Sequence, residues 1–160
     1  MKKSSKGFSL IELLIVVAII LIIAAIAIPN LLRSRIAANQ ASAVGSLRTL
    51  NTAEITYSST FNVGFSSTMT YLGPGAAGAN PTSTAAGLID SVLSTGAKSG
   101  YNFAYTAGSA DTSGRINTYS FTAVPITSST GTNYYYTDQS GVIRQNSTAT
   151  AQATDSPIAG

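Results

Sequence analysis

Acid–base chemistry in this 160-residue chain would have to come from carboxylates, because the sequence contains no Cys and no His. Metal sites built from Cys and His, and nucleophiles activated by His, are therefore excluded. The chain has six acids, and no two of them lie close in sequence: Glu12, Glu54, Asp90, Asp111, Asp138 and Asp155. We therefore predict no catalytic residues, no metal site and no cofactor, and we expect that the protein is not an enzyme.

Glu12 is the one acid in an unusual setting, because it lies inside an almost wholly apolar run. That run covers residues 8–28, FSLIELLIVVAIILIIAAIAI, and follows the short basic stretch MKKSSKG. As a helix at 1.5 Å per residue it extends about 32 Å, enough to cross a hydrocarbon core of about 30 Å. A carboxylate at the centre of such a helix costs about 2.5–3.5 kcal/mol on insertion scales. A segment that serves only as an anchor would gain by losing Glu12.

The net charge depends on the first residues of the chain. Nine basic residues face six acidic ones, but Lys2, Lys3 and Lys6 precede the apolar run. Without these three lysines, six basic side chains (nine minus three) face six acids. Because phosphate contacts need a basic patch, we predict no nucleic-acid binding by this chain alone.

Three interpretations of residues 1–28 compete. In the first, they form a secretory signal peptide with a small-residue cleavage site at Ala25-Ile26-Ala27, although the apolar run exceeds the usual 7–15 residues. In the second, they form a plain membrane anchor with its basic end in the cytoplasm. In the third, the chain is cut between the basic stretch and the apolar run, and the apolar helix stays attached to the remainder.

The third interpretation rests on a set of features that occur together. The segment KGFSLIELL, at residues 6–14, follows a short basic leader, precedes the long apolar run and is followed by Pro29. It strongly resembles the N-terminal signature of type IV prepilins, which also marks type II secretion pseudopilins. The resemblance implies cleavage between Gly7 and Phe8 by a prepilin peptidase, and methylation of the new N-terminus at Phe8. It also implies that Glu12 is the assembly glutamate and Pro29 the helix-breaking proline.

Beyond the apolar run, helical signals continue. We predict one helix from about Ser9 to about Ser59, kinked near Pro29 because proline removes a backbone hydrogen bond and clashes with the preceding turn. Apolar residues spaced three or four apart form a stripe that should face a core, with Glu54 as an exception within it. The stripe consists of Val44, Leu47, Leu50, Tyr57 and Phe61.

The second half of the chain has signals for loops and strands. Gly and Pro residues indicate a loop over residues 62–83, and TAAGLIDSVLST at 84–95 predicts a short helix. Alternating aromatic residues around 101–105 and 119–121 predict strands, and DQSG predicts a turn between strands at 134–136 and 142–144. We expect an antiparallel meander of three or four strands with an irregular tail.

These expectations combine into one organisation. The resemblance implies an α+β, ladle-like pilin fold, in which a long helix has an apolar protruding half and an amphipathic half packed on the meander. The expected parts are a leader at 1–7, a transmembrane and filament-core helix at 8–28, and a globular body at 29–160. The implied partners are other copies of the chain, the prepilin peptidase and N-methyltransferase, the membrane before assembly, and the assembly machinery of the inner membrane.

The predicted function is that of a structural subunit. The precursor would lie in the bacterial inner membrane and the mature chain in an extracellular pilus that supports adhesion, motility or DNA uptake. One alternative is a type II secretion pseudopilin. A more remote alternative is a membrane-tethered binding module that uses its sheet as a receptor, which would need neither Gly7 nor Glu12.

Overall fold

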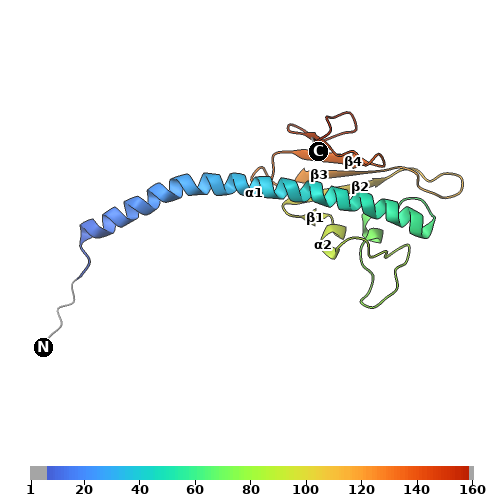
Figure 1. Ribbon diagram of the computed structural model, residues 1–160, viewed down its shortest axis with the longest axis horizontal. Helices are drawn as coiled ribbons and strands as arrows, with labels where there is room; N and C mark the ends of the chain where they lie inside the picture. Colours follow the sequence, from blue (N-terminus) through green and yellow to red (C-terminus); the bar gives the residue numbers. More distant parts are fainter. Residues whose placement is uncertain (1–6, 159–160) are drawn as a thin grey trace. The chain divides into compact units, whose positions relative to one another are not determined.

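The computed structural model describes residues 7–158 and has the expected α+β fold (Figure 1). Its elements in chain order are α1 (Leu10–Phe61), the 3-10 helix η1 (Met69–Leu72), α2 (Ser91–Ser94), β1 (Ala97–Lys98), β2 (Tyr101–Ala107), β3 (Tyr119–Pro125), β4 (Tyr134–Asp138) and β5 (Arg144–Asn146). The leader lysines at 2, 3 and 6 lie outside the described residues.

Helix α1 is 52 residues long and runs close to the predicted bounds of Ser9 and Ser59. It continues through Pro29, and a kink at this residue stays a prediction. Two compact units of the chain divide between Arg35 and Ile36. The first contains the apolar part of α1, and the second, here called the body, contains the remainder of α1 and all the strands. The expected boundary after residue 28 also stays a prediction.

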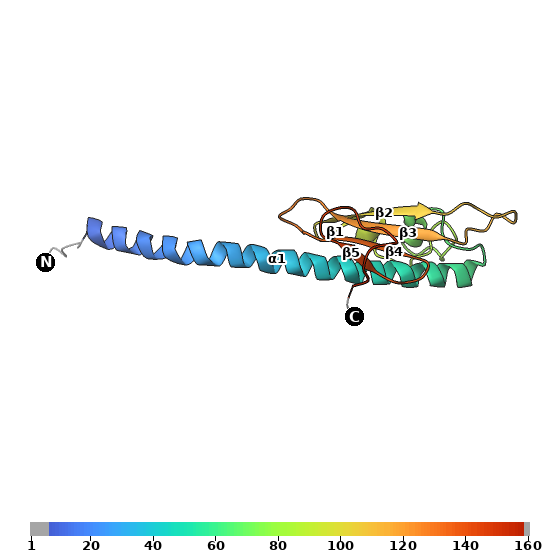
Figure 2. The same cartoon turned by 90° about the horizontal axis from the view of Figure 1, so that it is seen from above.

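The strands of the body form one antiparallel meander in the order β1-β2-β3-β4-β5 (Figure 2). Its register pairs Tyr105 with Phe121 and Phe121 with Thr137. Five strands are present, rather than three or four, because the two-residue β1 pairs with the start of β2, and so short a strand has no alternation to reveal it. The last strand begins at Arg144 rather than at Val142.

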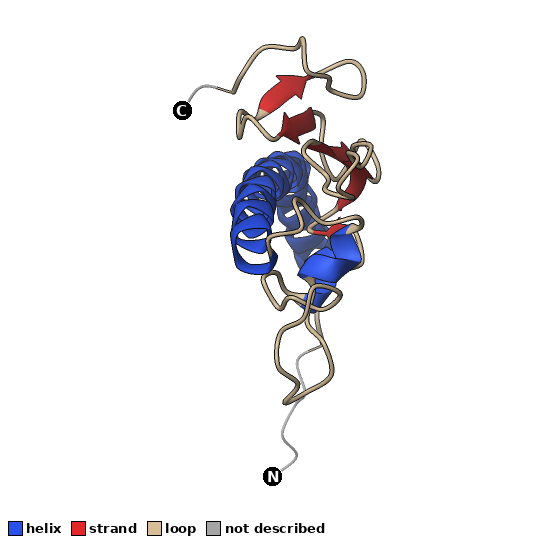
Figure 3. Cartoon of the chain, turned by 90° about the vertical axis from the view of Figure 1, so that its right-hand side faces the viewer, coloured by secondary structure: helices blue, strands red, loops and turns tan. Residues whose placement is uncertain are grey.

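The core lies between the sheet and the second half of α1, and Figure 3 shows the strands along one side of that helix. The predicted stripe is confirmed: Leu47, Leu50 and Tyr57 are buried, and Val44 and Phe61 pack against the core while partly buried. Across from the helix, alternate residues of β2, β3 and β4 face the same core, as a period of two requires. They are Tyr101, Phe103, Tyr119, Phe121, Ala123 and Tyr135.

The predicted helix at 84–95 is wrong in length, because α2 covers only Ser91–Ser94. Gly87 has a φ of +66°, in the left-handed region that breaks a helix. The backbone on either side of Gly87 forms hydrogen bonds with η1 instead of helical ones. The amide of Ala86 donates to the carbonyl of Tyr71, and the amide of Leu88 donates to the carbonyl of Leu72, both at 2.8 Å. The helix starts only at Ser91, after the N-cap Asp90, whose carboxylate accepts a hydrogen bond from the amide of Leu93 at 2.9 Å.

The body should fold without the apolar part of α1. A fragment starting at residue 30 keeps the core and the bonds from Asn39 to the carbonyl of Thr130 and from Gln40 to Thr132, both 2.9 Å. We expect helical circular dichroism and one cooperative thermal transition. A fragment starting at residue 46 lacks both bonds and the fully buried Ala43, and should melt at a lower temperature. A non-cooperative melt of the longer fragment would contradict this prediction.

Candidate functional site

The junction between Gly7 and Phe8 lies just ahead of helix α1 and is open to solvent. Phe8 is 83% exposed, and a Cβ added at Gly7 would meet nothing within 4 Å. No described contact within the chain therefore requires glycine at this position, and a requirement for it would have to come from a partner that approaches the backbone.

Glu12 lies in the first turn of α1 and caps the helix. Its Oε2 accepts a hydrogen bond from the backbone amide of Ser9 at 2.9 Å, and the amide of Leu13 donates to the carbonyl of Ser9 at 3.2 Å. Ser9 is thus the N-cap, and Glu12, three residues later, supplies the carboxylate half of a capping box. Sequence analysis missed this role, although the Ser-x-x-Glu spacing before an apolar run was its signal.

Glu12 has no cation partner among residues 7–158, where the only ion pair joins Lys98 to Asp90, at 2.8 Å. The positive pole of the helix favours an acid in the first turn. Next to Glu12, an apolar hollow is lined by Leu10, Leu13, Leu14 and Val17. The site therefore combines apolar surface with a carboxylate that pairs with no described cation.

The remainder of the apolar segment is exposed on every side. Between Leu10 and Ile28 all side chains are exposed except the half-buried Ala24. By length and composition, α1 can cross a membrane, and a helix that is apolar all round requires cover from lipid or from other helices. Sequence analysis placed Gly7, Phe8, Glu12 and Pro29 on this segment, and the structure places the first three at its start and Pro29 within the helix.

A second carboxylate, Glu54, is completely buried in the body. Its oxygens accept hydrogen bonds from the amide and hydroxyl of Ser66, at 2.9 and 2.6 Å, and the Tyr105 hydroxyl donates to the carbonyl of Ser66. Burial raises the pKa of Glu54, and the bonds from Ser66 only partly offset this. Ser66 is itself fully buried, and this cluster ties the segment after α1 to the helix and β2.

No group of three or more His, Cys, Asp or Glu residues able to hold a metal ion occurs among residues 7–158. Asp138 and Asp155, the acids nearest the C-terminal end, instead serve their own turns. Asp138 accepts from the amide of Ser140 at 2.9 Å, and Asp155 from the amide of Gln152 at 2.7 Å. Their carboxylates stabilise local loop structure.

Known proteins resemble this chain mainly through a short segment. The prokaryotic N-terminal methylation motif matches residues 2–28. The type IV wide pilus major component PilA4 of Thermus thermophilus is 65% identical over 37 residues, which are 23% of this chain and 28% of that protein. The type IV major pilin protein PilA of Myxococcus xanthus is 52% identical over 50 residues, 31% of this chain and 23% of that protein. No solved structure is significantly similar.

The chain thus spans about a quarter of the length of the curated relatives it matches. The long helix and the small antiparallel sheet follow an N-terminal segment that matches the methylation motif. The two curated proteins above are both major components of type IV pili, and this chain resembles them over 37 and 50 residues respectively.

Proposed function

We propose that this chain is the precursor of a structural pilin subunit, which polymerises into a type IV pilus-like surface filament once residues 1–7 are removed. The supporting observation is Glu12, which has no cation partner among the described residues and lies in the first turn of a helix whose apolar side chains are exposed all round. Hydrocarbon chains of lipid can cover such a helix, but they offer no partner for the carboxylate. Other copies of the helix can cover it and supply that partner.

Cleavage between Gly7 and Phe8 creates the partner. It frees an amine with a pKa near 7.7–8.0, which is largely cationic at neutral pH, and one added methyl group leaves that charge in place. Apolar packing alone allows many registers between neighbouring helices. A buried carboxylate restricts them, because an unpaired buried charge is strongly unfavourable. Glu12 therefore sets the axial register by pairing with the Phe8 amine of an adjacent subunit, as single buried polar groups do in coiled coils.

Repetition of this head-to-tail contact without closure builds a helical filament. The subunit then requires a prepilin peptidase that also methylates the new N-terminus, and an assembly machinery in the inner membrane. The precursor resides in that membrane and the mature chain in the extracellular filament. The filament supports adhesion, motility or DNA uptake, and the subunit itself has no catalytic role.

A type II secretion pseudopilin is the second candidate, because the same N-terminal features serve a short periplasmic filament. Location separates the two. Electron microscopy of filaments sheared from cells, with N-terminal sequencing of their main protein, should find this chain in long extracellular filaments. Confinement of the chain to the cell envelope would favour the pseudopilin.

Processing gives a direct test. Mass spectrometry of the native protein should show the loss of residues 1–7 and one added methyl on Phe8. Gly7→Ala should slow or block cleavage and leave the precursor in the membrane. Because a Cβ at Gly7 meets nothing within the subunit, a block would report the approach of the peptidase and not a folding defect.

Gly45→Ala is the matched control for this experiment. Gly45 also has open space around its Cα, and it lies inside α1, where alanine stabilises a helix by about 1 kcal/mol relative to glycine. This variant should be cut normally. A mature chain that begins at Ile28 would contradict the cleavage site at Gly7 and support a secretory signal peptide.

A further inference from the structure

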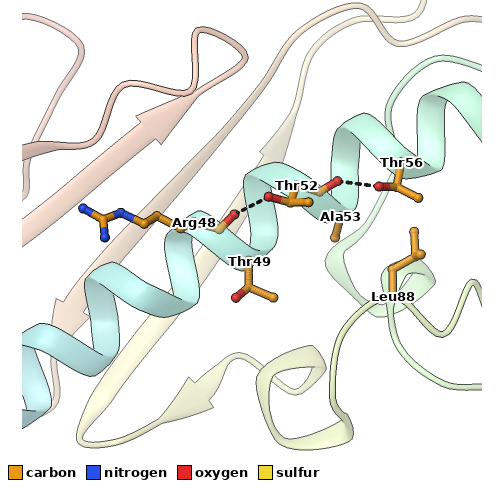
Figure 4. A pocket seen from close by; sticks show the side chains of 6 residues that line it. All are labelled: Arg48, Thr49, Thr52, Ala53, Thr56 and Leu88. Carbon is orange, nitrogen blue, oxygen red and sulfur yellow. Dashed lines mark hydrogen bonds between the residues drawn. The ribbon is translucent and has the colours of Figure 1, made fainter.

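A shallow groove lies on the body, between α1 and the segment that carries Leu88 (Figure 4). Its volume is about 310 Å³. Ala53 is buried beneath it, and Arg48 lies at the opposite end from Leu88. The full lining consists of Arg48, Thr49, Thr52, Ala53, Thr56 and Leu88.

The threonines of the groove offer methyl groups rather than hydrogen-bond donors. Thr49 donates its hydroxyl proton to the carbonyl of Gly45 at 3.1 Å. Thr52 donates to the carbonyl of Arg48 at 3.0 Å, and Thr56 to that of Thr52 at 2.9 Å (Figure 4). Because each proton is already used within the helix, the groove presents an apolar surface. Arg48 is its one cationic side chain.

Arg48 forms no ion pair with the described residues, since the single pair there is Lys98 with Asp90. The chain without its leader carries six basic and six acidic side chains (nine minus three lysines, and six). Its charges therefore balance overall, yet they remain largely unpaired within one subunit. A ligand that suits the groove brings an apolar side chain and a carboxylate.

We propose that this groove receives an apolar side chain and a carboxylate from a second copy of the chain, and so forms a contact between neighbouring subunits. The proposal rests on the proposed filament function. The groove lies on the same helix as the apolar segment, so copies that cover that segment lie beside α1. Each copy carries an exposed aspartate, Asp111, and two half-buried ones, Asp138 and Asp155, and none of the three has a cation partner among the described residues.

The two parts of the contact have different roles. An exposed ion pair is weak and is screened by salt, so the carboxylate at Arg48 selects the orientation of the neighbour. The apolar side chain against Ala53, Leu88 and the threonine methyls excludes water from the groove. Assembly repeats this contact at every subunit, and its charge component should make filament yield sensitive to ionic strength.

The absence of Cys from the chain permits a direct test by thiol labelling. Thr52→Cys places one thiol in the groove. In intact filaments this thiol should lose its reactivity towards maleimide, and it should regain it when the same filaments are dissociated in detergent. Ser128→Cys, in the exposed loop between β3 and β4, calibrates the reagent in both states. If Thr52→Cys assembles poorly alone, filaments that mix it with the wild-type chain give the same readout.

Equal reactivity of Thr52→Cys in filaments and in dissociated subunits would overturn the proposal. A failure of the wild-type chain to form filaments would instead overturn the proposed function. Arg48→Glu tests the charge component: it should reduce filament yield, whereas Arg48→Lys should preserve it. A normal yield from Arg48→Glu would overturn the assignment of a carboxylate to the groove.

Discussion

Filaments should be lost when Glu12 is replaced by alanine, although the precursor is still made, inserted and largely cut. Removing the carboxylate makes the segment more apolar, so membrane residence should improve by about 2.5–3.5 kcal/mol at depth and by less near the interface. In the filament, the neighbour's Phe8 amine would lose its partner. An unpaired buried cation represents a defect of roughly 3–5 kcal/mol at each contact, and the contact recurs at every subunit.

The capping bond from Ser9 to Glu12 requires a control, because alanine removes the cap as well as the charge. Loss of a cap costs about 0.5–2 kcal/mol and could weaken assembly by itself. Glu12→Gln separates the two effects, since glutamine also serves at this position of a capping box but carries no charge. If the charge sets the register, the glutamine variant should fail or be severely impaired as well.

Filament yield from sheared cells, counted by electron microscopy and normalised to the amount of cut subunit in the membrane, measures this effect. Wild-type yield from Glu12→Gln combined with loss in Glu12→Ala would assign Glu12 to helix capping alone. Wild-type filament yield from both variants would show that Glu12 has no role in assembly, and it would favour the plain membrane anchor.

Helix α1 could be predicted from sequence because its signals are local and long. The apolar run, the stripe through Leu47, Leu50 and Tyr57, and the lack of a further proline between Pro29 and Ser59 all favour one helix. The segment at 84–95 could not be predicted, because a single glycine at a positive φ and backbone bonds to residues 71–73 decide its structure. Those bonds join residues distant in sequence and leave no periodic pattern.

The candidate site divides in the same way. Gly7, Phe8 and Glu12 could be predicted because a basic stretch, a glycine, an acid and an apolar run follow one another at short spacing, as in the prepilin signature that this segment resembles. The environment of Glu54 could not be predicted. An acid within an apolar stripe looks like an exception until Ser66, in a loop, supplies two hydrogen bonds and Tyr105, in β2, closes over them.

Burial of Glu54 should make the body less stable as the pH rises from mild acid towards neutrality. Desolvation raises the pKa of Glu54 above its ordinary value of 4.5, against the effect of the Ser66 and Tyr105 hydrogen bonds. The folded state therefore binds a proton that the unfolded state releases. The stabilisation of the fold by this bound proton is fully present below pH 4.5. It is lost as the pH rises through the raised pKa of Glu54 in the folded state, and the free energy of unfolding then falls by at most about 1.4 kcal/mol per pH unit.

The other perturbed carboxylates act in a different range. The ion pair with Lys98 holds the pKa of Asp90 below 3.8, and backbone hydrogen bonds do the same for Asp111. Desolvation alone would raise the pKa of Asp138, but hydrogen bonds from Ser140 and Tyr136 together with the charge of Arg144 lower it on balance. These three carboxylates stabilise the fold at pH values above their ordinary pKa. That stabilisation disappears as the pH falls through their lowered pKa values in the folded state. The range above pH 4.5 therefore reports Glu54.

Two variants of the fragment that starts at residue 30 test this prediction by denaturant unfolding between pH 4.5 and 7. Glu54→Gln keeps an acceptor for the amide of Ser66 and a donor for its hydroxyl oxygen, so it should remove the slope and exceed the wild type in stability at neutral pH. Glu54→Leu also lacks the charge, but it leaves the amide and hydroxyl of Ser66 buried without a partner. It should be less stable than the glutamine variant by about 1–3 kcal/mol at every pH. Two results would contradict the prediction: a free energy of unfolding of the wild type that rises between pH 4.5 and 7, or a pH dependence that is unchanged in Glu54→Gln. Either would show that ionisation of Glu54 does not destabilise the folded state.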